Sequence, residues 1–144
     1  MRSCNDVMTK DPTCCMASDT IDKAAQIMKN EDVGSVPVVE SASSKKLLGI
    51  LTDRDIVMQV VAGKKDCANV KVEEVMTRNP VTCKPEDDVQ NAMDRMSQHQ
   101  VRRIPVVDGG GKIVGIIAQA DLATRMDHPE KTEKVLENIS QPVA

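Results

Sequence analysis

The stretch VMTKDP at residues 7–12 returns as VMTRNP at residues 75–80, which lie 68 positions further along the chain. At the same offset, VPVV at residues 36–39 matches IPVV at residues 104–107. Stretches that match in the same order indicate that one unit of sequence is duplicated. A unit that occurs only twice predicts two pseudo-equivalent halves that pair, because a solenoid needs at least three repeats to bury a continuous core.

A third match closes each repeat and sets the domain boundaries. KLLGIL at residues 46–51 matches KIVGII at residues 112–117, now at an offset of 66. We therefore assign the first repeat to residues 1–66, the second to residues 67–126 and a C-terminal tail to residues 127–144. A repeat of about 65 residues would hold only a marginal core alone, so we expect the two repeats to share one core.

The composition is typical of a globular protein, with 40% hydrophobic and 28% charged residues. A formal net charge of −3 gives no basic field that would attract nucleic acid or an anionic membrane. The chain has no Phe, Trp or Tyr, so it cannot stack bases as single-strand nucleic-acid binders do. The longest apolar run is too short to span a bilayer and the first residues lack an apolar signal region, so we expect a cytoplasmic location.

The five cysteines are an odd number without a CxxC motif, which argues against a disulfide framework. In a reducing cytoplasm we expect free thiols that pack as small buried hydrophobes. Two alternatives stay open. Cys14, Cys15 and Cys83, together with His99 or His128, could form a zinc site, although no pair has the spacing of a known motif. A redox-sensitive disulfide within or between subunits is the other.

Both repeats predict the same order of elements, β-α-β-β-α, and therefore an α/β (α+β) fold. Apolar residues at positions i, i+3, i+4 and i+7 predict one helix from Ile21 to Met28 and another from Val89 to Met96. Ser18 or Asp19 could cap the first of them. The remaining strands and helices are expected at residues 13–16, 36–39, 47–51 and 54–61, and at residues 81–84, 104–107, 113–117 and 119–126.

Two further features of the chain affect the expected fold. Pro37 and Pro105 lie inside predicted strands and supply no backbone donor, so each strand is expected at a sheet edge or with exposed backbone. In the tail, the spacing of Val135, Leu136 and Ile139 indicates a short closing helix or a partner contact.

The stretch GILTDRD at residues 49–55 is the sharpest local motif. Thr52 and Asp55 have the spacing of a helix capping box, a purely structural role. The same groups could bind a ligand, because a helix N-terminus offers unpaired N–H groups to a phosphate and a carboxylate can accept from two ribose hydroxyls. One box could serve both purposes, and Arg54 is a further candidate ligand contact.

The second copy of this motif, GIIAQAD at residues 115–121, keeps Asp121 but has Ala118 in place of the cap hydroxyl. An N-cap contributes about 1 kcal/mol, so a pure cap should have kept its hydroxyl. The retained acid favours a ligand role and predicts that the two sites differ. In a strand Arg102 and Arg103 point to opposite faces. A solvated pair on a strand edge is the structural alternative, and of the two arginines Arg103 is our candidate for a phosphate contact.

These motifs resemble the tandem cystathionine-β-synthase (CBS) domain family, whose pairs are called Bateman modules. The resemblance covers residues 5–126. It rests on the repeated V-M-T…P segments, on the two hydrophobic-Pro-Val-Val strands, and on the pattern Gly, two apolar residues, Thr, two residues of any type and Asp at residues 49–55. The stretches TDRDI and HQVRRIPV are similar to those of stand-alone CBS pairs. The resemblance implies two β-α-β-β-α motifs related by a pseudo-twofold axis, a homodimer, and a regulatory role without catalysis.

The resemblance also implies a ligand: AMP, ADP, ATP or S-adenosylmethionine, bound in clefts between the motifs and signalling through dimer geometry or an unknown effector protein. In the first cleft Thr52 and Asp55 would hold phosphate and ribose, while the adenine would meet Thr13, Cys14, Val36 and Pro37. In the second cleft Asp121 would hold the ribose, and the base would meet Thr82, Cys83, Ile104 and Pro105. The alternative is a ligand-free dimerisation or interaction protein, with a metal or disulfide. No cofactor, catalytic residue, nucleic acid or membrane is expected.

Overall fold

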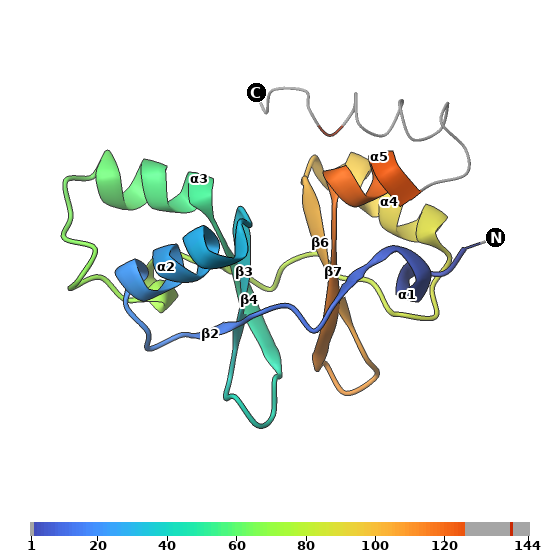
Figure 1. Ribbon diagram of the computed structural model, residues 1–144, viewed down its shortest axis with the longest axis horizontal. Coiled ribbons are helices and arrows are strands. Elements are labelled where there is room, and N and C mark those ends of the chain that lie inside the picture. The colour runs from blue at the N-terminus through green and yellow to red at the C-terminus, as the bar shows by residue number, and fades with distance from the viewer. Residues whose placement is uncertain (1, 126–138, 140–144) are drawn as a thin grey trace. The chain divides into compact units, whose positions relative to one another are not determined.

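The computed structural model describes residues 2–125 and residue 139 (Figure 1). The chain forms two compact units that cross the repeat boundaries. Unit 1 comprises Met1–Asp11, Val81–Gly110 and Val114–Ala144, and unit 2 comprises Pro12–Pro80 and Gly111–Ile113. Each V-M-T opening therefore belongs to the unit built from the other repeat. The boundaries at residues 66 and 126 remain a prediction about the duplication.

Unit 2 contains a four-stranded sheet in the order β2-β3-β4-β5. The pair β2–β3 is parallel, whereas β3–β4 and β4–β5 are antiparallel. Helix α2 lies against β3 and β4 (Figure 1). The elements are β2 (Cys15–Met16), α2 (Ile21–Glu31), β3 (Ser35–Val39), β4 (Leu47–Thr52), α3 (Asp53–Ile56), the π-helix η1 (Val57–Val61), the 3₁₀-helix η2 (Val72–Glu74) and β5 (Thr77–Arg78).

Unit 1 contains a three-stranded sheet in the order β1-β7-β6, flanked by α4 and α5 (Figure 1). Strand β1 runs antiparallel to β7, and Cys83 forms an isolated parallel bridge with Val106. The elements are α1 (Cys4–Val7), β1 (Thr9–Lys10), α4 (Val89–His99), β6 (Arg103–Val107), β7 (Ile113–Ala118, whose first residue is counted with unit 2) and α5 (Gln119–Arg125).

The predicted α+β fold is confirmed, but the strand expected at residues 81–84 is only the isolated bridge of Cys83, and the helix expected at residues 54–61 continues as a π-helix after Ile56. The cap of the first long helix was also assigned wrongly. Thr20, not Ser18 or Asp19, is the N-cap of α2, and its side chain makes no capping hydrogen bond. The Asp19 carboxylate instead accepts from the backbone N–H of Met16 at 2.8 Å and so closes the preceding turn. At the matching position of the second repeat, Asp87 accepts from Lys84 N–H at 2.9 Å. The role of Asp19 and Asp87 is therefore to close these turns.

The two strand prolines occupy different places. Pro105 lies in β6, an edge strand of the sheet in unit 1, as predicted. Pro37 lies in β3, an interior strand and not an edge, but no strand pairs with it on the side of β2, as the alternative of exposed backbone predicted. Strand β2 covers only the end of β3, beginning opposite Val38. The interior strand tolerates a residue without a backbone donor because its parallel neighbour has not yet begun at that level.

The buried apolar residues form two clusters, one in each unit, instead of the single shared core that the sequence predicted. The repeats instead exchange their first segments, so that the V-M-T residues of each repeat pack in the core formed by the other. In unit 1, Val7 and Met8 join the buried residues of α4, β6 and α5. In unit 2, Val75 and Met76 join those of α2, β3 and β4. Each exchanged opening enlarges a core that one repeat could fill only marginally.

Two glycines allow the exchanged V-M-T segments to pack closely against strands β4 and β7. A Cβ added at Gly49 would lie 2.5 Å from the carbonyl oxygen of Thr77 and 3.0 Å from the sulfur of Met76. A Cβ added at Gly115 would lie 2.4 Å from the sulfur of Met8. These two glycines are equivalent in the repeats, and each lies beneath the V-M-T segment that comes from the other repeat. Close backbone approach is the usual reason for glycine inside a strand.

The tail prediction falls mostly outside the described residues, which include neither Val135 nor Leu136. Ile139 is described: it is helical and buried in the core cluster of unit 1. Within the described part of the chain, no helix has both the length and the apolar character needed to cross a membrane.

Candidate functional site

The box formed by Thr52 and Asp55 is closed in both directions. The hydroxyl oxygen of Thr52 accepts from the Asp55 N–H at 3.1 Å, and the Asp55 Oδ2 accepts from the Thr52 N–H at 3.0 Å. The capping role predicted from the spacing is therefore present. Two groups remain for a ligand: the hydroxyl proton of Thr52, and the Asp55 Oδ1, which makes no hydrogen bond to another described residue.

Strands β3 and β4 bring most of the first predicted set to one end of the sheet. Ser35 pairs with Thr52, so Val36 lies one residue along β3 from the box. The Asp53 N–H donates to the carbonyl oxygen of Gly34 at 2.9 Å, which fixes the start of α3 against the start of β3. This contact was not predicted, because it joins a loop carbonyl to a helix N-terminus and leaves no pattern in the sequence.

The predicted adenine contacts of this set differ in exposure. Val36 and Pro37 are buried, so their contact with an adenine stays a prediction. Cys14 is half-buried and burial raises the pKa of its thiol. Thr13 is exposed, and its hydroxyl donates to Glu31 Oε1 at 3.0 Å. Both precede β2, which runs parallel to β3.

Arg54 supplies a cation next to the box. It is the second residue of α3 and is exposed. Its guanidinium forms no ion pair with another residue in the described part of the chain. It is therefore able to meet an anionic group without first breaking a salt bridge.

The second set, in unit 1, repeats half of the box. The Asp121 Oδ2 accepts from the Ala118 N–H at 2.8 Å, as Asp55 does from Thr52. The Gln119 N–H donates to the Arg102 carbonyl oxygen at 2.9 Å, which repeats the contact between Asp53 and Gly34. Our inference that the retained acid favours a ligand role therefore loses its force. Asp121 caps the helix start by itself, which is reason enough for an acid at this position.

The predicted base contacts of the second set lie mainly in the core. Ile104, Pro105 and Cys83 are buried. A hydrogen bond with Cys4 and then burial raise the pKa of the Cys83 thiol. Thr82 is half-buried, and its carbonyl oxygen accepts from the Arg95 guanidinium. Arg95 was missed at the sequence level, because a helix-surface arginine gives no signal of the carbonyl that it will meet.

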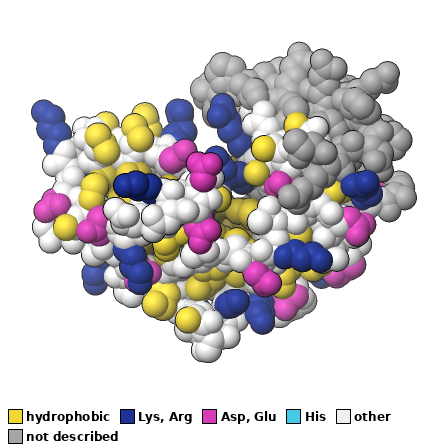
Figure 2. Space-filling view, viewed as in Figure 1, with side chains coloured by type: hydrophobic (Ala, Val, Ile, Leu, Met, Phe, Trp, Pro, Cys, Tyr) yellow, Lys and Arg dark blue, Asp and Glu magenta, His cyan; other side chains and the backbone are white. Residues whose placement is uncertain are grey.

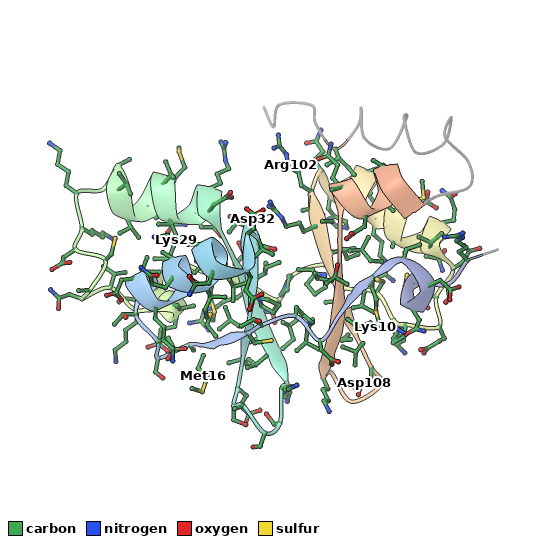
Figure 3. The ribbon with its side chains drawn as sticks, viewed as in Figure 1. Lys10, Met16, Lys29, Asp32, Arg102 and Asp108 are labelled. Carbon is green, nitrogen blue, oxygen red and sulfur yellow. The ribbon has the colours of Figure 1, made fainter. Side chains whose placement is uncertain are left out.

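The two adjacent arginines differ in exposure. Arg102 is exposed at the start of β6, where Figure 3 shows its side chain extending away from the strand. Arg103, the first residue of β6, is half-buried. Arg102 precedes β6, so strand alternation does not explain this difference, and the phosphate contact of Arg103 stays a prediction.

A metal centre finds no support in the described part of the chain, where no group of three His, Cys, Asp or Glu side chains is placed to hold an ion. Cys14 and Cys15 are adjacent, but burial raises the pKa of the Cys15 thiol to about 12. A zinc ion deprotonates the thiol that coordinates it, so this pKa does not decide the zinc hypothesis. His128 lies outside the described residues, so its part in the zinc hypothesis stays a prediction.

Comparison with known proteins agrees with the repeats and the fold. The family model of the CBS domain matches residues 4–62 and again residues 72–128. The CBS domain-containing protein YhcV of Bacillus subtilis is 39% identical over 140 residues, covering 97% of this chain and 96% of the relative. Hypoxic response protein 1 of Mycobacterium tuberculosis is 32% identical over 126 residues, covering 88% and 86%.

Two solved structures are similar in fold. The crystal structure of Hypoxic Response Protein I, with two coordinated zinc ions, has a TM-score of 0.77 at 31% identity, covering 86% of this chain and 98% of that one. The CBS domain pair of protein MJ0100, in complex with 5′-methylthioadenosine and S-adenosylmethionine, has a TM-score of 0.76 at 29% identity, covering 85% and 94%. By its repeats, fold and relatives, this chain belongs to the CBS domain family and is a tandem CBS pair.

Proposed function

We propose that this chain is a regulatory module that binds an adenosyl compound, either an adenine nucleotide (AMP, ADP or ATP) or S-adenosylmethionine. The observation that carries the proposal is the MJ0100 domain pair, a 29% identical structure in complex with two adenosyl compounds. The chain's own support is the Thr52–Asp55 box with the exposed Arg54 beside it.

In unit 2, each polar group of the box retains capacity for a ligand. The Asp55 Oδ1 accepts a ribose hydroxyl while Oδ2 keeps its capping bond. The Thr52 hydroxyl donates to a phosphate or carboxylate oxygen while it accepts from Asp55 N–H. Arg54 supplies positive charge, which a nucleotide phosphate prefers to a neutral donor.

In unit 1, the same chemistry is weaker. Ala118 has no hydroxyl to donate to a phosphate, whereas Asp121 makes the same capping bond as Asp55. The half-buried Arg103 supplies the cation that replaces the missing donor. We therefore propose that the two units bind with different affinities, unit 2 more tightly.

The proposed role is sensing, not catalysis. A ligand changes the conformation of a protein only by binding one state more tightly than another. The chain would pass such a change to an effector protein, and its carboxylates would position the ribose without transferring protons.

A thermal-shift titration tests this function. At a ligand concentration about 100 times Kd, binding adds about 2.7 kcal/mol, which raises Tm by roughly 5–10 °C. S-adenosylmethionine or an adenine nucleotide should produce this shift, and GTP, which carries the same phosphates on another base, should not. Equal shifts with GTP would show phosphate binding without adenine recognition, and no shift with any compound would refute the proposal.

A second candidate function follows from the capping bonds of the two acids. Because both acids cap helix starts, the chain is also consistent with a ligand-free dimerisation or interaction protein. The titration separates the two functions, since this candidate predicts no shift with any adenosyl compound.

We also propose that the chain forms a homodimer through the exposed apolar side chains of Val57, Met58 and Val61 in η1. They are 54%, 57% and 62% exposed, and Figure 2 shows hydrophobic side chains at the surface in this region, at the upper left. Clustered apolar side chains on a surface mark contacts between proteins. Because η1 follows directly after α3, this dimer interface would lie close to the Thr52–Asp55 box of the same unit.

Substitution of Val61 by glutamate should raise the dimer dissociation constant at least about 30-fold, which corresponds to 2 kcal/mol at a central interface position. Sedimentation equilibrium measures the change. Val33→Glu is the matched control, because Val33 is also exposed and apolar but lies outside η1. A dimer that survives Val61→Glu, or a wild-type chain that is monomeric, would contradict this interface.

A further inference from the structure

One polar side chain is buried in the sheet of unit 2 without a hydrogen-bond partner. Ser35, the first residue of β3, is only 8% exposed, and it is the sole polar or charged residue that is buried in the described part of the chain. Its hydroxyl makes no hydrogen bond with another described residue. Because a buried hydroxyl without a partner destabilises a fold, stability does not explain this serine.

The hydroxyl of Ser35 nevertheless stays accessible. Among the described residues, every side-chain oxygen or nitrogen that is fully covered has a hydrogen-bond partner. The Ser35 oxygen has none, so part of its surface remains uncovered. A serine hydroxyl can donate one hydrogen bond and accept others, and this one keeps its whole capacity for a small molecule.

The pairing of β3 with β4 places this hydroxyl beside the Thr52–Asp55 box. Ser35 lies directly opposite Thr52, so both side chains are on the same face of the sheet. The Asp53 N–H donates to the Gly34 carbonyl oxygen at 2.9 Å, which is the pattern of a non-hydrogen-bonded pair. The Cβ atoms of such a pair lie about 4.5–5.5 Å apart. The hydroxyls of Ser35 and Thr52 are therefore neighbours.

The two hydroxyls lie on the face of the sheet that does not form the core of unit 2. The next pair along the strands is Val36 with Leu51, and both residues belong to the core cluster that also contains the apolar side chains of α2. Neighbouring residues of a strand point to opposite faces. Ser35 and Thr52 therefore point away from α2 and its apolar surroundings.

The second repeat also has a hydrogen-bond donor at the position of Ser35. Arg103 precedes the stretch IPVV as Ser35 precedes VPVV, at the offset of 68 residues. Each is the first residue of a strand that is otherwise apolar. A donor at one position in two apolar strands favours a role in binding, with a charged group in unit 1 and a hydroxyl in unit 2.

We propose that Ser35, together with Thr52, binds the anionic group at the 5′ end of the adenosyl ligand in unit 2, an inference that rests on the function proposed above. A phosphate or a carboxylate has adjacent oxygens, and each of the two neighbouring hydroxyls donates to one of them. Asp55 follows Thr52 by three residues and holds the ribose. Ser35 thus selects adenosyl compounds that carry a negative charge at this end.

Ser35→Ala tests this assignment with two ligands that differ in charge. The affinity for AMP should fall at least about 10-fold, because a hydrogen bond to a charged group is lost. The affinity for 5′-methylthioadenosine, which has an uncharged sulfur in place of the phosphate, should change less than about twofold, since the lost bond requires the anion. Calorimetric titration measures both, and S-adenosylmethionine replaces AMP if the wild type binds only that anionic compound.

Ser18→Ala is the matched control. Ser18 is an exposed serine of the same unit that follows the end of β2, and its variant should bind AMP like the wild type. Without ligand, Ser35→Ala should melt at the wild-type Tm or slightly above it, because the substitution breaks no hydrogen bond within the described fold. A Tm several degrees lower would show a structural role for the hydroxyl and overturn the inference.

The titrations separate this inference from the function on which it rests. Unchanged AMP affinity in Ser35→Ala, or equal losses for AMP and 5′-methylthioadenosine, would overturn the role of Ser35 while the wild type still binds its ligand. A wild-type chain that binds no adenosyl compound would refute the proposed function and this inference together.

Discussion

Gly49→Ala is expected to destabilise the protein by about 3 kcal/mol, the upper end of the cost of overpacking. The added methyl group would lie 2.5 Å from the Thr77 carbonyl oxygen. That oxygen belongs to the backbone of β5, which pairs with β4 at this position, Gly49 opposite Arg78. The strand can yield only by leaving the sheet, and with it Met76 would leave the core of unit 2. Thermal or urea unfolding measures the loss.

Two further alanine substitutions make the test specific. Gly109→Ala should change stability by less than about 0.5 kcal/mol, because nothing lies within 4 Å of the added carbon. Gly115→Ala should fall between the two. Its nearest obstacle is the flexible side chain of Met8, and the backbone oxygen of Thr9 is further away at 3.0 Å. If Gly49→Ala were as stable as Gly109→Ala, the exchanged packing of the V-M-T segments would be wrong.

The second large effect concerns the proposed ligand. Asp55→Asn should weaken the binding of an adenosyl compound by roughly 10- to 100-fold, because a hydrogen bond to a charged group contributes about 1.5–3 kcal/mol. The asparagine side-chain oxygen can still accept from Thr52 N–H, so the helix start is retained. Calorimetric titration measures the affinity, and Tm without ligand shows whether the fold is intact.

Asp53→Asn is the matched control for this substitution. Asp53 is an exposed acid two residues away, and its carboxylate accepts only from the adjacent Arg54 N–H at 2.8 Å among the described residues. The variant has the same charge as Asp55→Asn and should bind like the wild type. Equal losses in the two variants would mean that net charge, not the ribose contact of Asp55, determines the affinity.

The parts of the fold that could be predicted are those with a short-range sequence pattern that occurs in both repeats. The apolar spacing from Ile21 to Met28 recurs from Val89 to Met96, and both helices form at these positions. The exchange of the openings could not be predicted. Strands β1 and β5 have two residues each, too few for periodicity, and their partners lie far away in the sequence. The only signal was a glycine kept at equivalent positions, Gly49 and Gly115.

The candidate site was predictable in its residues but not in their roles. Spacing alone identified Thr52 and Asp55 as a box, and the box forms. Spacing also identified Asp121, but a comparison of two copies could not reveal that an acid caps the Ala118 N–H without a hydroxyl partner. Val36, Ile104 and Cys83 are buried, which strand patterns could not predict, and their contact with a ligand stays a prediction.

The central claim is that this CBS pair binds an adenosyl compound, and equilibrium dialysis of the ligand-free protein tests it most directly. The chain has no Phe, Trp or Tyr, so adenine absorbance measures bound ligand with little background. We expect saturable binding of S-adenosylmethionine, AMP, ADP or ATP that Asp55→Asn weakens and GTP does not displace. Absence of saturable binding by all four compounds at millimolar concentration would contradict the claim and leave the chain as a ligand-free interaction protein.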